Sequence, residues 1–257
     1  MELHPLLNGA RNFRAVLPYG TADGRRLRAD FLFRSGELSR LDEADLPVLE
    51  GLNVRLVCDL RSSGEQSAYP TRWPGAAPRQ LMLPGQARDD AGPMAIFQVI
   101  SAHEGERGAT LAMDRLYRRK PLIFAPVLRV LAGDIIAGGA LPLLVHSGKD
   151  RTGFMVAMLL AMLGVSRDDI MADYALTARF FPPVEEIPQT ISWARESYGH
   201  VLTAIQVKPL VEARPEYLAA SFAEIEGTYG GMDAYISQHI GLDETAIANL
   251  REALLTQ

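Results

Sequence analysis

The sequence predicts an α/β domain, in which a central, mostly parallel sheet is flanked by helices and followed by a helical C-terminal part. Two continuous apolar runs, residues 54–62 and 141–147, indicate the sheet, because each alternates with helical patterns and ends in polar or charged residues. The nearly unbroken helical patterns of residues 167–257 indicate the C-terminal part. We therefore expect residues 1–257 to form a single domain, with residues 85–122 as a candidate insertion or lid.

The first third of the chain carries the expected edge of the sheet and the first helix. Asp23 and Gly24 form a turn signal between apolar segments, so residues 12–35 are interpreted as a hairpin region. The further elements expected here are a helix at residues 39–52, capped by Ser39 or Asp42, and strands at residues 31–35, 54–62 and 79–84.

The middle of the chain is less regular until the second buried strand. Residues 85–109 mix glycine, charged and apolar residues, which is typical of an insertion or of a mobile lid. Residues 113–133 have a helical pattern, which we expect to break at Pro121 because proline cannot donate a helix hydrogen bond. The strand at residues 141–147 is followed by an almost wholly apolar, and therefore buried, helix at residues 152–164.

The composition is that of an ordinary soluble protein, with 48% hydrophobic and 22% charged residues. A net charge of −5 argues against a general nucleic-acid binder, because phosphate backbones require clustered lysine and arginine. The single cysteine, Cys58, lies in an apolar run and is expected to be a reduced core residue. No signal-peptide pattern is visible, and the longest apolar run, residues 154–165, is too short to cross a bilayer. We expect a cytoplasmic protein without a transmembrane segment, while secretion by a signal-free route stays open.

The junction between the second buried strand and the next helix has the chemistry of a phosphate-binding loop. In order, it consists of His146, Ser147, Gly148, Lys149, Asp150, Arg151, Thr152 and Gly153. Glycine lets backbone N–H groups turn inward around an anion, and the helix N-terminus adds unpaired donors and a partial positive charge. Arg151 can form two hydrogen bonds to one phosphate, and Lys149 adds a second charge. Asp150 can either donate a proton to a leaving oxygen or orient Arg151, and Thr152 can donate to phosphate or cap the helix.

Less specific interpretations of these residues stay open at this point. A strand, a glycine and a helix in succession are common, and the three charged residues can form a solvated loop tip. His146, at the end of a buried strand, is more often a hydrogen-bonded core residue than a base. The Walker A pattern is absent, and the five histidines of the chain show no paired metal-ligand spacing. We therefore expect neither a metal nor a cofactor.

Several motifs, taken in their order along the chain, resemble those of bacterial Cys-dependent protein tyrosine phosphatases whose phosphate loop reads Gly-Lys-Asp-Arg-Thr-Gly. The similar segments are residues 10–14 (ARNFR), 21–41, 54–65, 146–153, 173–181, 228–242 and 250–255. They are spread over most of the chain. The resemblance therefore implies a tyrosine-phosphatase-like fold and a phosphomonoester hydrolase.

The resemblance also implies a mechanism and a set of site residues. In the family, a cysteine thiolate attacks phosphorus, and water hydrolyses the phosphocysteine; the substrate is a protein phosphorylated on tyrosine or, for some members, a phosphoinositide. Arg151 is expected to bind the equatorial oxygens, Asp150 to act as general acid or orienting carboxylate, and Lys149 to attract further negative charge. His146 completes the expected catalytic set. The other residues expected around the phosphate are Ser147, Gly148, Thr152 and Gly153, supported by Asp59, Arg61, Arg34 and Arg14.

The loop departs from the family pattern at the nucleophile. The family has a cysteine and two further residues between the histidine and the glycine, whereas only Ser147 separates His146 from Gly148 here. Ser147 is a poor substitute, because a hydroxyl is far less acidic than a thiol and only three residues, rather than five, separate it from Arg151. Cys58 belongs to a different strand and is not expected to replace the missing thiol.

Three explanations of the short loop stay open. The sequence is incomplete at this point, or the protein is a pseudophosphatase that binds phosphorylated ligands without turnover, or a deletion has left an inert scaffold. An inert loop has no chemical need for Lys149, Asp150 and Arg151 together. We therefore expect a phosphatase by family, with phosphate binding without catalysis as the alternative.

Overall fold

A computed structural model describes residues 7–71, 73, 76–82, 92–139 and 142–257 of the chain. Its central sheet has the strand order β1-β3-β6-β4-β5 and is parallel except for β1, which runs antiparallel to β3. The strands are β1 (Arg14–Ala15), β3 (Leu32–Ser35), β6 (Leu143–His146), β4 (Leu56–Asp59) and β5 (Arg79–Met82). The predicted α/β architecture with a mostly parallel sheet is confirmed.

The register of the parallel strands brings the segments that follow them to one edge of the sheet. Ser35, the last residue of β3, and Asp59, the last residue of β4, are both register partners of His146, the last residue of β6. The polar residues that follow β4 and β6 therefore meet at the carboxyl edge, which is where open α/β sheets bind ligands.

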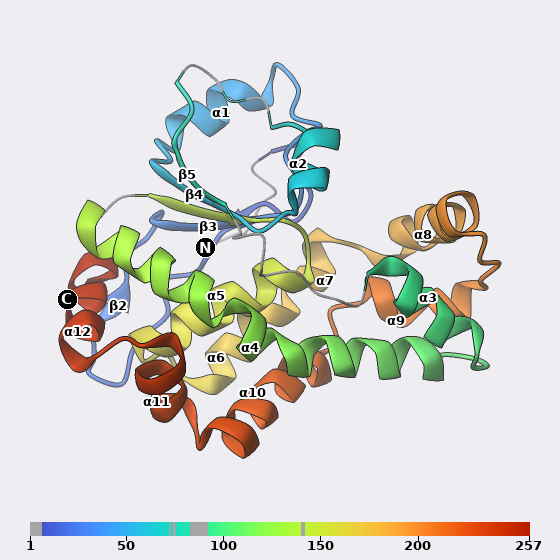
Figure 1. Cartoon of the computed structure of the whole chain (residues 1–257). Coiled ribbons are helices and arrows are strands. Elements are labelled where there is room, and N and C mark those ends of the chain that lie inside the picture. The colour runs from blue at the N-terminus through green and yellow to red at the C-terminus, as the bar shows by residue number, and fades with distance from the viewer. Residues whose placement is uncertain (1–6, 72, 74–75, 83–91, 140–141) are drawn as a thin grey trace.

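Helices cover both faces of the sheet (Figure 1). On one face lie α1 (Asp45–Gly51) and α2 (Ser63–Ala68), and on the other lie α4 (Arg107–Gly138) and α5 (Asp150–Leu163). The helical C-terminal part adds α6 (Arg167–Ala175), α7 (Thr177–Phe180), α10 (Pro215–Tyr229), α11 (Met232–Ala234), a π-helix η1 (Tyr235–Ile240) and α12 (Glu244–Leu254). The remaining helices, α3 (Pro93–Ser101), α8 (Pro183–Tyr198) and α9 (Ala204–Val211), project to one side of the molecule.

Three apolar cores hold these layers together. The largest lies between the sheet and the helices α4, α5 and α10, and α5 is buried almost all round, as its composition predicts. A second core, which includes Phe33 and Val57, joins the opposite face of the sheet to α1. The third core, with Phe97, Leu202 and Val207, belongs to the projecting helices, which therefore pack as a unit.

The predicted break at Pro121 is wrong, because α4 is a single helix of 32 residues that contains both Pro121 and Pro126. A proline at position 121 leaves the carbonyl of Tyr117 without its helical N–H donor. The hydroxyl of Ser221, on α10, donates to that carbonyl at 2.6 Å, and the hydroxyl of Tyr235 donates to the Pro121 carbonyl at 2.7 Å. The Ser221 hydroxyl thus replaces the donor that Pro121 removes, the Tyr235 hydroxyl adds a further bond to the same stretch, and the helix continues.

Among the described residues, α4 is also the one helix long and apolar enough to cross a membrane, judged by length and composition alone. Within its most apolar window, 44% of the residues are buried inside the protein. The helix packs against α3, α9, α10 and α12, so core packing explains its apolar character. The expected absence of a transmembrane segment stays a prediction.

The N-terminal elements differ in detail from those expected. The turn at Asp23 and Gly24 is confirmed, with Gly24 at φ +86°. The hairpin is short: across the turn Gly20 forms an antiparallel bridge with Arg26, and the Leu27 N–H donates to the Tyr19 carbonyl at 2.9 Å. In addition, β2 (Arg26–Leu27) pairs with β7 (Leu255–Thr256) near the C-terminus. Such a pairing joins residues more than 200 positions apart, so no local pattern indicates it.

Two further expectations need new bounds. The helix expected at residues 39–52 begins only at Asp45. The Asp42 carboxylate accepts the backbone N–H of Ala44, which precedes the helix, and that of Asp45, its first residue. In the candidate lid at residues 85–122, residues 85–91 lie outside the described residues, whereas residues 92–122 contain α3, a turn at residues 102–106 and the first half of α4. A role of this segment as a lid stays a prediction.

Candidate functional site

The candidate loop joins β6 to α5 by three residues and lies at the carboxyl edge of the sheet. Gly148 has φ +140°, a backbone conformation that residues with a Cβ rarely adopt, which explains the first glycine of the motif. The helix begins at Asp150, and no side chain caps it. The N-terminal donors of α5 therefore face the short loop, as the motif predicts.

Arg151 is held by a carboxylate of the protein itself. Its two terminal nitrogens donate to the two carboxylate oxygens of Glu65 at 2.9 and 2.6 Å, and one of them also donates to the carbonyl of Leu60 at 2.8 Å. Burial opposes the charge of Glu65, but the hydrogen bonds and the charge of Arg151 prevail and lower its pKa to about 2. Glu65 thus occupies the two-pronged position in which Arg151 is expected to hold a phosphate.

Glu65 owes its position to a capping box at the start of α2. The Ser62 hydroxyl accepts the backbone N–H of Glu65, and the Glu65 carboxylate accepts the backbone N–H of Ser62. The Ser-x-x-Glu spacing that predicts such a box is visible in the sequence. The sequence analysis did not name Glu65 as a site residue. The spacing marks it as a helix-capping residue, but no local signal identifies Arg151 as its partner.

Lys149 points into the protein. Its ammonium group donates to the carbonyls of Leu210, at 2.9 Å, and of Glu212, both at the end of α9, and lies 3.2 Å from a carboxylate oxygen of Asp150. Burial lowers the pKa of Lys149, and the carboxylate of Asp150 opposes that effect. The expectation that Lys149 attracts further negative charge of a ligand does not fit this arrangement, because its donors are engaged by backbone carbonyls.

Asp150 is connected to the interior by two buried tyrosines. The hydroxyl of Tyr117, on α4, donates to Asp150 Oδ1 at 2.7 Å, and the hydroxyl oxygen of Tyr174, on α6, lies 2.7 Å from that of Tyr117. Burial raises the pKa of Tyr117, and the negative charge of Asp150 adds to this effect. Both tyrosines were missed, because nothing in their local sequence distinguishes them from other aromatic core residues.

His146 does not have the surroundings of a catalytic base. It is 1% exposed, and burial lowers its pKa to about 4, so the imidazole is neutral at pH 7. Its Nε2 lies 3.6 Å from Asp59, whose carboxylate is engaged by the Arg61 guanidinium at 2.8–3.2 Å. This geometry favours the core interpretation of His146. Asp59 and Arg61 pair with each other after the end of β4, and their support of the phosphate loop stays a prediction.

The two hydroxyls of the loop are turned towards the protein. The Thr152 hydroxyl is buried and donates to the carbonyl of Ser35 at 3.3 Å, which ties α5 to the end of β3. The Ser147 hydroxyl lies 3.5 Å from that of Thr152. Thr152 therefore neither caps the helix nor presents its proton to the open side of the loop.

Behind the loop lies a buried cluster with more positive than negative charge. Arg14 and Arg34, on β1 and β3, both contact the carboxylate of Asp173, and both also bond to Thr177. Burial, together with the charge of Arg34, lowers the pKa of Arg14 to about 9. The two arginines thus support the sheet edge from inside, where they do not reach a ligand. Asp173, their counter-ion, was missed by the sequence analysis.

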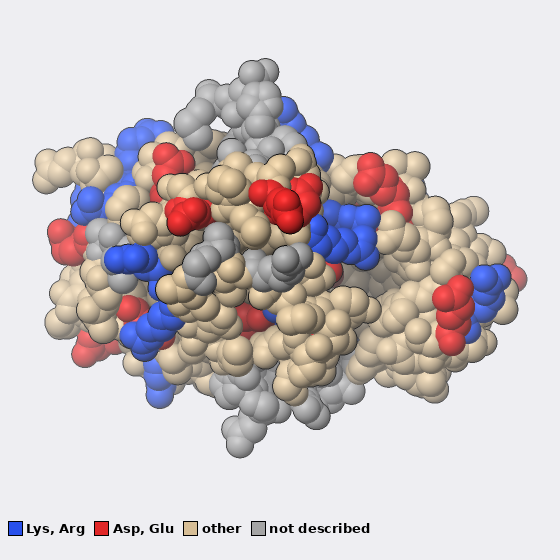
Figure 2. All heavy atoms as spheres, turned by 90° about the horizontal axis from the view of Figure 1, so that it is seen from above, with Lys and Arg blue, Asp and Glu red and all other residues tan. Residues whose placement is uncertain are grey.

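The charged residues at this edge are therefore largely matched inside the protein. Figure 2 shows basic and acidic side chains lying next to each other near the middle of the upper face, beside the hollow that separates the projecting helical part from the rest. Arg151 and Lys149, the two cations of the loop, are both already engaged by groups of the protein.

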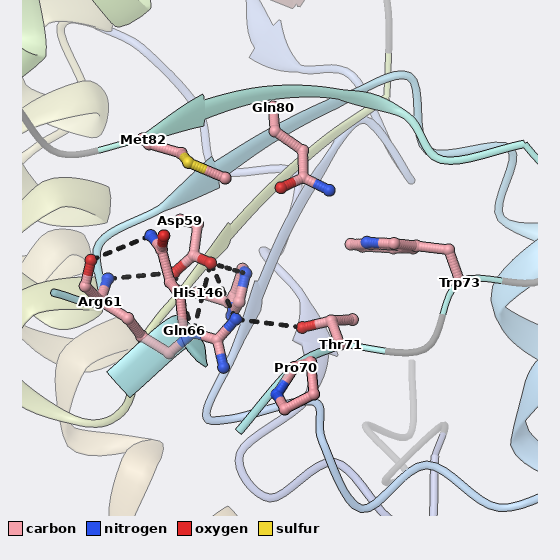
Figure 3. Close-up of a pocket in the computed structure, with 9 residues that line it drawn as sticks. All are labelled: Asp59, Arg61, Gln66, Pro70, Thr71, Trp73, Gln80, Met82 and His146. Atoms are coloured by element: carbon pink, nitrogen blue, oxygen red, sulfur yellow. Dashed lines mark hydrogen bonds and ion pairs between the residues drawn. The ribbon is translucent and has the colours of Figure 1, made fainter. Parts of the chain in front are cut away.

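A small cavity of about 180 Å³ lies beside the loop (Figure 3). It is lined by Asp59, Arg61, Gln66, Pro70, Thr71, Trp73, Gln80, Met82 and His146. Of these residues, only Arg61 carries a full positive charge at pH 7, and its guanidinium is fixed by Asp59, the Tyr69 carbonyl and Thr71. The cavity therefore offers no available cation for a phosphate.

No thiol lies at the loop. Cys58, the only cysteine of the chain, is fully buried in β4 and packs in the core on the α4 and α5 side of the sheet. Burial raises its pKa, and the charge of Asp59 adds to this, so the thiol stays protonated. The prediction that Cys58 is a reduced core residue is confirmed. In the described part of the chain, no group of His, Cys, Asp and Glu side chains is arranged to hold a metal ion.

Comparisons with known proteins agree with the predicted fold. A family model described as the tyrosine phosphatase family matches residues 5–256. The chain is 33% identical over 278 residues to the triple specificity protein phosphatase PtpB of Mycobacterium tuberculosis, which covers 97% of this chain and 98% of that protein. It is 28% identical over 233 residues to a tyrosine-protein phosphatase of Nostoc commune, which covers 88% of this chain and 74% of that protein.

Proposed function

Because this chain belongs to the tyrosine phosphatase family, we propose that its site is the β6–α5 loop and that it acts there on phosphomonoesters. The observation that carries the proposal is the position of Arg151. Its guanidinium lies at the carboxyl edge of the sheet, beside the N-terminus of α5, and already binds a carboxylate through both terminal nitrogens. A phosphate has the oxygen geometry that this two-pronged contact fits.

Binding in this proposal is an exchange of anions at Arg151. The side chains of Arg151 and Glu65 are 30% and 41% exposed, so their ion pair is weak enough to open. A phosphate that replaces Glu65 gains the same two hydrogen bonds and, in addition, the donors at the start of α5. Asp150 and Lys149 stay in place, because both are bonded to buried groups.

The proposed substrates are a protein phosphorylated on tyrosine and a phosphoinositide. The family match supports the first, and a relative whose name states triple specificity supports a range of substrates wider than one. The one cysteine is free, which fits a reducing compartment, so a cytoplasmic location is part of the proposal.

A second candidate function is binding of phosphorylated ligands without turnover. One observation favours it: the loop has no thiol, and Ser147 is hydrogen-bonded towards the protein without a base beside it. An unactivated serine hydroxyl is a weak nucleophile. In this case Arg151 holds the phosphate, and no phosphoenzyme forms.

Turnover and binding measured on the same protein separate the two candidates. An intact-mass spectrum first establishes the length of the loop. The chain is then assayed for release of p-nitrophenol from p-nitrophenyl phosphate without added metal, with and without vanadate, and titrated with phenyl phosphate by calorimetry. Arg151→Ala is expected to abolish whichever activity is present. Arg55→Ala, at an exposed arginine before the opposite end of β4, is the matched control and is expected to change neither.

A loop-restored variant completes the test. Inserting a cysteine after His146 and an alanine after Ser147 places five residues between the thiol and Arg151, as in the family pattern. Turnover by the unmodified chain supports hydrolysis. Binding that becomes turnover only after the insertion supports the second candidate. Failure of both proteins to bind phenyl phosphate contradicts both proposals.

A further inference from the structure

A directed chain of hydrogen bonds ends on Asp150. The Tyr117 hydroxyl donates its proton to Asp150 Oδ1 at 2.7 Å, so the 2.7 Å contact between the two tyrosines requires Tyr174 to donate to Tyr117. Each hydroxyl has only one proton, and therefore the direction of the chain is fixed. Hydrogen bonds in such a series strengthen one another when they end on a charged acceptor.

Both tyrosines are buried, whereas Asp150 reaches the surface. Tyr117 is 0% and Tyr174 1% exposed, while the side chain of Asp150 is 25% exposed. Asp150 Oδ1 receives the Tyr117 proton and also lies 3.2 Å from Lys149 Nζ. One oxygen of the carboxylate is thus committed to the interior. The other, Oδ2, is the atom left to meet a ligand.

The second glycine of the loop motif belongs to the same arrangement. A Cβ atom added at Gly153 would lie 2.9 and 3.0 Å from two ring atoms of Tyr174, which is closer than Cβ atoms approach other carbons. Gly153 is in the first turn of α5, so its missing side chain lets the Tyr174 ring pack against that turn. The glycine thereby allows Tyr174 to reach Tyr117 at the distance observed.

We propose that Tyr117 and Tyr174 are positioning residues for Asp150: together they hold Oδ1 in the interior and present Oδ2 to the oxygen of a bound phosphomonoester. The inference rests on the proposed function for its effect on a ligand. The geometry itself does not depend on that function. The simpler alternative is that two buried hydroxyls satisfy each other and a nearby carboxylate, with no consequence for binding.

The affinity for a phosphate separates these alternatives. The Tyr117 hydroxyl draws the negative charge of the carboxylate towards Oδ1 and holds that oxygen in the interior. Losing this donor leaves more negative charge on Oδ2 and frees the carboxylate to turn, so binding of a phosphate is expected to weaken. The charged groups nearest to the pair, Lys149 in the loop and Lys120 over the Tyr117 ring, stay the same in every variant.

The experiment measures phenyl phosphate affinity by calorimetry at pH 7 in the full chain. Tyr117→Phe is expected to weaken binding about tenfold, which is the effect that one hydrogen bond to a charged group supports. Tyr174→Phe is expected to weaken binding less, because the donor to Asp150 remains. Tyr235→Phe is the matched control: it removes another fully buried hydroxyl, which donates at 2.7 Å to an α4 carbonyl away from the loop.

A double-mutant cycle with Asp150→Asn makes the test specific. In the Asp150→Asn background, Tyr117→Phe is expected to cause no further change in affinity. If Tyr117→Phe and Tyr235→Phe lower stability alike and leave the affinity for phenyl phosphate unchanged, the positioning role is overturned.

A spectroscopic readout keeps this test apart from the test of the proposed function. The hydroxyl proton of Tyr117, assigned by its disappearance in Tyr117→Phe, is followed by proton NMR. A change of its chemical shift in Asp150→Asn supports the hydrogen-bonded arrangement even when no ligand binds and the proposed function fails. An unchanged shift overturns the inference.

Discussion

His146 is expected to make the protein less stable in mild acid. Burial, with smaller contributions from Arg61 and Arg151, lowers its pKa from 6.5 in the unfolded chain to about 4 in the fold, although the Asp59 carboxylate opposes this. Between these two values the unfolded state binds one more proton than the folded state, so the free energy of unfolding falls as the pH falls. The loss begins near pH 6.5 and is complete near pH 4, where the difference corresponds to about 3 kcal/mol.

Urea unfolding from pH 7.5 to pH 5.0, followed by far-UV circular dichroism, measures this effect. At pH 5.0 we expect the linkage to have cost the wild type about 2 kcal/mol relative to pH 7.5. In His146→Asn that part of the pH dependence is expected to vanish, whereas His200→Asn, at a partly exposed histidine of the projecting helices, is expected to retain it. His200→Asn controls for the loss of one histidine, so the difference between the two variants reports the burial of His146. Equal slopes in the wild type and in His146→Asn would show that His146 is not held neutral by burial.

Three further changes test the packing around the loop. Ser221→Ala removes the donor to the Tyr117 carbonyl inside α4 and is expected to lower the free energy of unfolding by about 1–3 kcal/mol in urea titrations; no loss would mean that water replaces the hydroxyl. Gly153→Ala is expected to cost about 1–3 kcal/mol by overpacking against Tyr174, and a stable, unshifted variant would contradict the close contact. Lys149→Met leaves two carbonyls at the end of α9 without a donor, so amide hydrogen exchange in α9 should accelerate; unchanged exchange would refute that anchoring role.

Local sequence patterns predicted the helices and strands of this protein better than they predicted the contacts between them. The loop is where it was expected because a buried strand, a glycine and an apolar helix follow one another within a few residues. The break expected at Pro121 is absent because of a contact that the local sequence does not show. The compensating hydroxyl, on Ser221, comes from a helix about 100 residues further along the chain. The same distance in sequence hides the pairing of β2 with β7.

For the site, too, the sequence predicted the residues but not their contacts. The residue types at the loop indicate anion binding, but they do not show which negatively charged group contacts each of them in the folded protein. Glu65 reaches Arg151 from α2, and Tyr117 reaches Asp150 from α4. These contacts are set by the register of the sheet and by the packing of α4, neither of which is visible in the motif itself.

The groups that already bind Arg151 and Lys149 decide which of these two cations is available to a phosphate. Arg151 is bound by a carboxylate on the partly exposed surface, and a phosphate can replace that carboxylate without leaving Arg151 unpaired, provided that Glu65 turns into water. Lys149 is bound by carbonyls at the end of α9, and withdrawing its ammonium group would leave these acceptors without a partner, at a cost of about 1–3 kcal/mol each. The two cations are therefore not equivalent: Arg151 is the one available to a ligand, whereas Lys149 fixes the loop to the projecting helices. The proposed function therefore requires that a ligand at this edge compete with Glu65 and leave Lys149 in its place.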